Sequence, residues 1–311
     1  MGGKKPSGAA KREEEAIERA REEMERLKLE PTALWTGLVL HHRDIFVSHV
    51  LPKLNDTDRY FFSKANSDGE NLLKYAEIDL SKLRWSVNEC SSISTLEWAW
   101  NNMEWGEKTY WGSVMDQPWF CSQVALTNKL EFLKWAREVK KCDWDKETIN
   151  TAARKGNLEM LKYCFANDCP CDEKQSCVET VKLEGHLDCL RFLLDNLKPS
   201  RDVESDVTVK AAAQGHLDIL KYCIEERKIT DRLEGCLMFA AGEGKLSCLK
   251  YLVEEAKAPL NITEFVCVAR FREYYECENY LLEKGVPEPT EQEYEDFVSY
   301  VNGQMRRMGL D

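Results

Sequence analysis

One short sequence pattern recurs through the last two-thirds of the chain at a nearly constant spacing. It consists of a glycine, a polar residue and a leucine, then two variable residues, a leucine, a basic residue and an aromatic residue. Four full copies start at Gly156, Gly185, Gly215 and Gly244. Weaker copies surround Leu130 and Tyr275, so the leading apolar positions lie 28 to 30 residues apart. A fixed period in this range is typical of stacked repeat proteins, whose units bury their apolar faces only against one another.

Each unit is expected to form two short helices joined by a tight turn. Small residues precede several of the glycines, as at Ala211 and Ala212, and would let the two helices approach closely. Glycine adopts the left-handed backbone conformation without a steric penalty, so it suits the turn between the helices. After the turn, apolar residues at Leu217, Leu220 and Tyr222 predict the second helix.

The segment AAAQGHLDILKY at 211–222 resembles the second half of the ankyrin repeat motif. The resemblance covers residues 120–285 and extends more weakly from residue 91. It implies an all-α ankyrin-type helix-turn-helix solenoid of about six to seven short repeats that binds proteins. The family's Thr-Pro-Leu-His turn is replaced, for example by DVTV at 206–209, and each unit is shorter than the family's usual length. We therefore expect modest stability in the weaker units.

The repeats are expected to occupy residues 91–287, with an inserted tryptophan-rich loop near 101–120. Residues 288–311 are expected to form a C-terminal capping helix, because the end of a solenoid needs a polar outer face. Thr290 and Glu293 have the spacing of a capping box, which would begin this helix.

Residues 1–30 combine a start that is expected to be disordered with a strongly charged helix. The helix is rich in glutamate paired with arginine or lysine at helical spacing. It also carries one narrow apolar stripe, formed by Ile17, Ala20, Met24 and Leu27. The stripe leaves two alternatives open, a solvated helix or a short coiled coil with another chain.

Residues 31–90 are expected to form a small helical bundle. Within it, the segment DIFVSHVLPKLNDTDRYFFSKAN at 44–66 resembles an F-box, although the family's leading Leu-Pro and closing Arg-Trp are missing. The resemblance implies that a cullin-ligase adaptor protein docks on an exposed apolar patch formed by Ile45, Val50, Leu51 and Leu54. The alternative is a plain cap that seals the N-terminal end of the solenoid.

Charge and cysteine content limit the environment of the chain. The net charge of −12 argues against nucleic acid as the main ligand, because phosphate binding needs a basic surface. No apolar run is long enough to span a membrane. The thirteen cysteines recur at equivalent repeat positions, such as Cys189, Cys248 and Cys277, which predicts small buried side chains and a cytoplasmic or nuclear location. A zinc site is the alternative for one group: Cys164, Cys169, Cys171 and Cys177.

The sequence predicts a non-enzymatic scaffold that binds a protein partner and uses no metal or cofactor. It contains no glycine-rich phosphate loop, nucleophile elbow or metal-binding helix motif. Exposed tryptophans and loop residues that have no role in the repeat are the expected partner contacts: Trp105, Trp111, Trp119, Trp144, Asp145, Lys174, Arg201, Arg227 and Arg232. The alternatives are an F-box-like adaptor that recruits substrates to a ubiquitin ligase, and a scaffold held at a membrane by its N-terminus.

Overall fold

The computed structural model describes residues 42–65, 67–109, 112–180, 185–260 and 262–307. Within these ranges the regular secondary structure is helical, apart from an isolated antiparallel bridge between Lys108 and Val114. The all-helical class predicted from the sequence is therefore confirmed for the described residues. The chain divides into two compact units, Met1–Asn101 and Asn102–Asp311. The charged helix and apolar stripe expected within residues 1–30 lie outside the described residues.

The described part of the first unit consists of short helices. They are α3 (Arg43–Ile45), η2 (Phe46–Val50), η3 (Leu51–Lys53), α4 (Asp56–Ala65), α5 (Ser67–Tyr75), η4 (Val87–Glu89) and α6 (Ile93–Asn101). Asn55 caps α4, because its side-chain oxygen accepts a hydrogen bond from the Asp58 backbone N–H at 2.7 Å. The core of this unit is a cluster of buried apolar residues: Phe46, Leu51, Leu72, Leu73 and Leu83.

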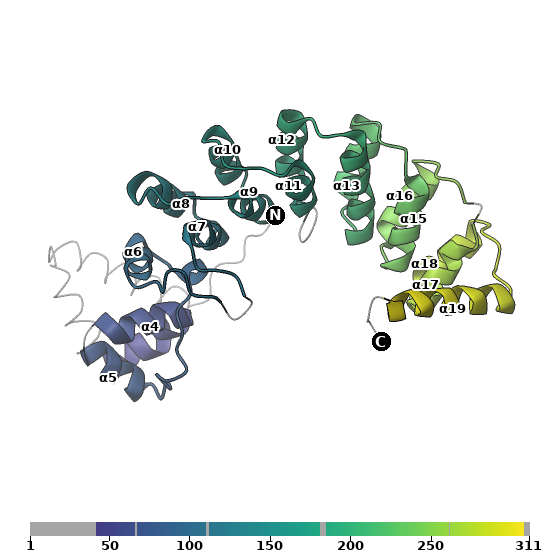
Figure 1. Ribbon diagram of the computed structural model, residues 1–311. Helices are drawn as coiled ribbons and strands as arrows, with labels where there is room; N and C mark the ends of the chain where they lie inside the picture. The colour runs from purple at the N-terminus through teal and green to yellow at the C-terminus, as the bar shows by residue number, and fades with distance from the viewer. Residues whose placement is uncertain (1–41, 66, 110–111, 181–184, 261, 308–311) are drawn as a thin grey trace, which may run out of the picture. The chain divides into compact units, whose positions relative to one another are not determined.

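The second unit is a row of helical pairs (Figure 1). The first helices of the pairs are α7 (Gln117–Leu126), α9 (Lys146–Arg154), α11 (Glu173–Glu179), α13 (Arg201–Gln214), α15 (Leu233–Gly242) and α17 (Glu264–Phe271). The second helices are α8 (Leu130–Lys134) with η5 (Trp135–Val139), α10 (Leu158–Ala166), α12 (Leu187–Leu197), α14 (Leu217–Lys221) with η6 (Tyr222–Glu226), α16 (Leu246–Glu254) and α18 (Tyr275–Glu283).

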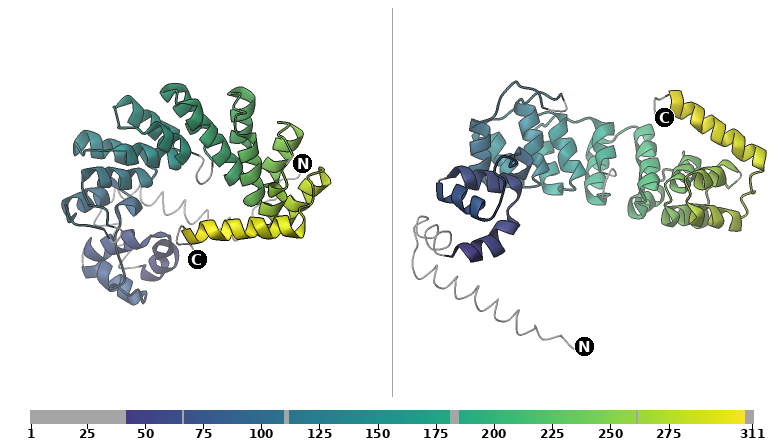
Figure 2. Two further views of the ribbon diagram at one scale, coloured as in Figure 1. Left: turned by 45° about the vertical axis from the view of Figure 1, so that its right-hand side comes forward. Right: turned by 90° about the horizontal axis from the view of Figure 1, so that it is seen from below.

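Equivalent helices of successive pairs pack on one another, which gives the second unit a helical repeat-like fold. Each first helix contacts the next one from α7 through to α17, and second helices contact in the same way, as α14, α16 and α18 do. Figure 2 shows the row from two further directions. The pairs therefore share one continuous core, as expected for units that cannot bury their apolar faces alone.

The turns between paired helices are left-handed, as the sequence predicts. Gly156 and Gly185 have φ angles of 65° and 70°. The next unit packs directly on these turns, because a Cβ atom built at Gly185 would lie within 3.0 Å of the His216 ring. In the weaker copies, Asn128 and Glu273 occupy the equivalent positions and keep φ angles of 61° and 63°.

A second series of left-handed residues ends most of the second helices. This second series consists of Lys141, Asp168, Lys198, Lys228 and Lys257, with φ between 50° and 59°. These residues carry side chains, whereas most turns between paired helices have glycine. Gly285 occupies the corresponding position after α18, with a φ of 90°. A Cβ atom at Gly285 would have no neighbour within 4 Å. This turn therefore has room for a side chain, whereas the turn at Gly185 has none.

The basic-aromatic step of the repeat pattern connects successive second helices. The Tyr280 hydroxyl donates a hydrogen bond to Glu254 at 3.2 Å, and the Lys250 ammonium lies 5.6 Å from the Tyr280 ring centroid. The same hydroxyl-to-carboxylate bond recurs at 3.1 Å for Tyr163 with Glu138 and for Tyr251 with Glu225. Each of these tyrosines thus contacts acidic and basic residues of the preceding pair, which fixes the register between neighbours.

One joint in this series is built differently. Phe192 occupies the tyrosine position of its unit and has no hydroxyl to donate. At the position three residues after the preceding aromatic, the three tyrosine joints described above have glutamate and the joint to Tyr222 has Asp195, but this joint has Ala166. Phe192 packs edge-on against Phe165 instead, with ring centroids 5.6 Å apart. The loss of the donor therefore coincides with the loss of the acceptor.

The cysteines are core residues, as predicted from their repeat positions. All thirteen are free thiols, and all except Cys171 are buried. Burial raises the pKa of the Cys223 thiol to about 11, since a thiolate is poorly solvated in the core. The described residues contain no group of three or more His, Cys, Asp or Glu side chains that could hold a metal ion, so the zinc alternative finds no support in them.

The C-terminal helix α19 (Glu291–Arg307) packs on α17 at the end of the row. It begins with the predicted capping box. The Thr290 backbone N–H donates to the Glu293 carboxylate at 2.8 Å, and the Glu293 N–H donates to the Thr290 hydroxyl at 3.3 Å. Phe297 of α19 contacts Phe271 of α17 edge-on, with ring centroids 6.3 Å apart.

Candidate partner-binding surface

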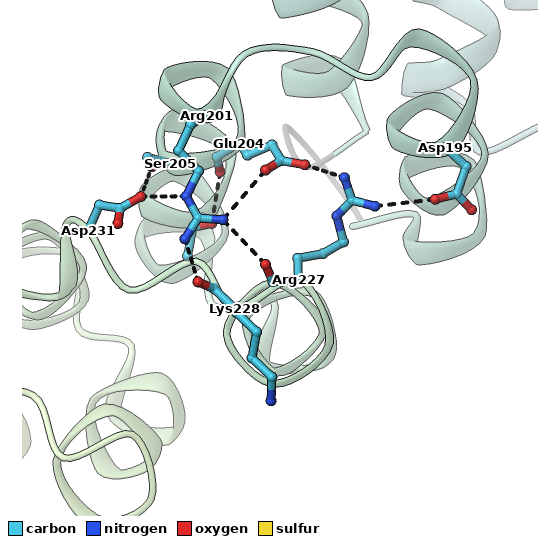
Figure 3. Close-up of polar contacts among 8 residues, drawn as sticks. Asp195, Arg201, Glu204, Ser205, Arg227, Lys228 and Asp231 are labelled. Atoms are coloured by element: carbon cyan, nitrogen blue, oxygen red, sulfur yellow. Dashed lines mark hydrogen bonds and ion pairs between the residues drawn. The ribbon is translucent and has the colours of Figure 1, made fainter.

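Two of the basic residues predicted as partner contacts, Arg201 and Arg227, form ion pairs within the chain (Figure 3). Arg201 bonds Asp231 at 2.6 Å and donates to the backbone carbonyls of Arg227 and Lys228. Arg227 bonds Asp195 at 3.3 Å and also donates to Glu204. Glu204 is only 7% exposed, so its charge is compensated inside the unit. These contacts join residues that lie 23 to 32 positions apart in the sequence.

Asp206 bonds the other two predicted basic contacts, Lys174 and Arg232. Lys174 bonds it at 2.5 Å, and Arg232 donates to it from the following unit. The hydrogen bond from Lys174 is the largest cause that lowers the pKa of Asp206 below its usual range. All four predicted basic residues therefore form ion pairs that connect neighbouring repeat units. A further role in binding a partner stays a prediction.

The predicted tryptophan and aspartate contacts lie in several environments. Trp105 is 40% exposed, and its ring centroid lies 5.9 Å from that of Phe120. Trp119 is half-buried in the first turn of α7, and Trp111 lies outside the described residues. Trp144 is half-buried beneath the Arg137 guanidinium, which lies 4.1 Å from its ring centroid. Asp145 caps α9 by accepting the Glu147 N–H at 3.0 Å.

The four residues predicted to dock an adaptor protein do not form one exposed apolar patch, which corrects that prediction. Leu51 is 3% exposed and belongs to the core of the first unit, and Val50 and Leu54 pack against the same core. Ile45 alone of the four is largely exposed, at 49%. The correction has a simple cause: a unit this small needs Leu51 to complete its apolar core.

A hollow of about 580 Å³ opens between α15, α17 and α19. Its apolar lining comes from all three helices: Met238 of α15, Cys267 of α17, and Phe297 and Tyr300 of α19. Tyr300 is 67% exposed, so part of this apolar lining faces solvent. Such a depression, with apolar and polar groups on rigid helices, has the character of a binding site.

Acidic side chains line the same hollow. Glu264 begins α17, and Glu293 and Asp296 lie in the first two turns of α19. Lys and Arg are absent from the described residues that line it. Burial raises the pKa of the Cys267 thiol above its usual value, Glu264 and Glu293 raise it further, and Arg270 opposes them.

The hollow was not predicted from the sequence. The repeat pattern indicated that residues 288–311 cap the array, but it could not place this helix beside α17. An apolar helix face preceded by several glutamates was the available signal. The hollow has no catalytic constellation among its described residues, which offer an apolar floor and carboxylates suited to binding.

Each helix in the described ranges is too short or too polar to cross a lipid bilayer. Comparison with known proteins gives no assignment, since neither a family model nor a curated protein matches this chain.

Proposed function

We propose that this chain is a non-enzymatic scaffold that binds a protein partner through its second unit. The repeat pattern, the left-handed turns and the stacked helical pairs support an ankyrin-type solenoid of about six to seven short repeats, capped by α19. Proteins of this architecture present rigid surfaces on which exposed side chains can vary without cost to the scaffold. The free thiols are consistent with work in the cytoplasm or nucleus.

The hollow between α15, α17 and α19 is the single observation that carries this proposal. The four predicted basic contacts are already paired with neighbouring parts of the chain, so they are less available to a partner. The hollow instead offers apolar groups at its surface, with Tyr300 largely exposed and Met238 half-buried. Aromatic and methionine side chains of this kind are enriched at protein interfaces.

Selection of random twelve-residue peptides displayed on phage, with the full chain as target, tests the proposal. Clones are then compared on the Met238→Ala/Tyr300→Ala variant. The matched control is Tyr275→Ala, which alters a tyrosine that is 60% exposed and lies on α18. The proposal expects clones that bind the wild type and the control but lose binding to the double variant. Recovery of clones that ignore the hollow, or of none, would refute it as the binding surface.

An F-box-like adaptor of a ubiquitin ligase is the second proposal, favoured only by the exposure of Ile45. Its test is a pull-down of the full chain with purified cullin-ligase adaptor protein, beside the Ile45→Asp variant. Binding that Ile45→Asp abolishes supports this function. Absence of binding by the wild type reduces the first unit to a cap for the repeats.

A further inference from the structure

The carboxylates of the hollow differ from those that bond Lys174, Arg201 and Arg232, because their charge is not neutralised. The loop carboxylates Asp206 and Asp231 each bond an arginine or a lysine. Glu264, by contrast, has no ion-pair partner among the described residues. Asp296 accepts one hydrogen bond, from Gln292 at 3.0 Å, and this neutral donor leaves its charge in place.

The nearest basic residue on α17 does not neutralise these carboxylates. Arg270 lies one turn beyond Cys267 and bonds Glu278 at 2.7 Å and Glu288 at 3.4 Å. Its guanidinium is also 5.5 Å from the Tyr294 ring centroid. Because Arg270 is engaged in these contacts, the negative charge beside the hollow is available to a ligand.

Apolar and acidic groups are combined closely enough for one side chain to meet both. Met238 and Phe297 provide the apolar surface, and Glu264 and Asp296 provide the charge. Arginine and lysine match this combination, since their long aliphatic stems cover apolar surface while the charged head reaches a carboxylate. A carboxylate also binds a guanidinium with strong, charge-assisted hydrogen bonds.

We propose that the hollow receives a basic segment of a partner protein, with an arginine or lysine beside Glu264 and Asp296 and a neighbouring apolar side chain on Met238 and Phe297. The inference rests on the proposed function and adds the chemical class of the partner. Charge complementarity favours this occupant, and the whole chain is acidic as well, with a net charge of −12.

The test uses the full chain labelled with 13C-methyl methionine, in which loss of a signal from Met238→Leu identifies the Met238 resonance. Three peptides are titrated: acetyl-Leu-Arg-Leu-Arg-Leu-amide and the same sequence with Gln or Glu in place of Arg. The Glu264→Gln/Asp296→Asn variant removes the proposed charges. Glu276→Gln/Glu283→Gln, on exposed positions of α18, removes the same net charge away from the hollow. Glu293 is left intact because it forms the capping box of α19 with Thr290.

The expected result is a saturable shift of the Met238 methyl signal with the arginine peptide, weakened about tenfold by Glu264→Gln/Asp296→Asn and unchanged by the α18 variant. Equal shifts with the glutamine or glutamate peptide would overturn the basic-segment inference and leave protein binding at the hollow intact. An equal loss in both charge variants would also overturn it, because attraction would then be non-specific. No shift with any peptide would count against both the inference and the hollow as a binding surface.

Discussion

The close contact between successive turns gives a sharp prediction for Gly185→Ala. Gly185 has a φ of 70°, and a Cβ atom there would lie within 3.0 Å of the His216 ring of the next unit. An alanine at this position therefore adopts an unfavourable backbone conformation and also displaces His216. Gly285→Ala separates the two effects, since Gly285 has a φ of 90° and open space around its Cβ position.

The expected losses of stability follow from the backbone conformation and from the contact with His216. A residue with a Cβ atom in a left-handed conformation costs roughly 1–2 kcal/mol, and an overpacked contact costs about 1–3 kcal/mol more. We therefore expect Gly185→Ala to lower the free energy of unfolding by about 3 kcal/mol and Gly285→Ala by about 1 kcal/mol. The smaller value agrees with Lys198 and Lys228, which carry side chains at the positions equivalent to Gly285.

Equilibrium urea unfolding followed by far-ultraviolet circular dichroism measures both variants. A double-mutant cycle with His216→Ala isolates the contact, because in that background Gly185→Ala should cost only the backbone term. The reasoning fails if Gly185→Ala costs no more than Gly285→Ala, or if His216→Ala recovers none of the difference.

Three further predictions concern the tyrosine-to-glutamate hydrogen bonds, the ion pairs of Arg227 and the core of the first unit. Burial and the Glu254 carboxylate raise the pKa of Tyr280 to about 12, so its stabilising contribution is complete below its ordinary value of 10 and is lost as the pH rises towards 12. Tyr280→Phe should therefore reduce the fall in melting temperature between these pH values. Arg227→Met leaves buried Glu204 without its closest partner and should cost about 2 kcal/mol in urea unfolding. Leu51→Asp should unfold the first unit in hydrogen-exchange experiments, whereas Ile45→Asp should not.

Matched substitutions serve as controls. Arg232→Met breaks a more exposed set of pairs and should cost less than about 1 kcal/mol, so an equal loss with Arg227→Met would contradict the role given to buried Glu204. Phe192→Tyr adds a hydroxyl where Ala166 offers no acceptor, and it should not improve stability at neutral pH. An unchanged alkaline profile in Tyr280→Phe would show that the pKa of Tyr280 does not differ between the folded and unfolded states.

The repeat pattern contained enough information to predict the elements that depend on local conformation. Glycine at the turns, the capping box of Thr290 and Glu293, and burial of the repeated cysteines were all predicted from residue type and spacing. The ion pairs of Arg201 and Arg227 were not, because their partners lie 23 to 32 residues away in the sequence. The hollow was missed for the same reason: its lining depends on where α19 packs, which no local pattern specifies.

The Phe192 and Ala166 joint has a consequence for how such an array can change length. If the single unit containing Ala166 were duplicated, a tyrosine would follow a unit that lacks an acceptor, and its hydroxyl would enter the joint without a carboxylate. Duplication of this unit together with the following one avoids the mismatch, because Asp195 occupies the acceptor position after Phe192. At this place in the array, growth by a two-unit block is therefore less costly than growth by one unit, so the unit with Ala166 is not interchangeable with its neighbours.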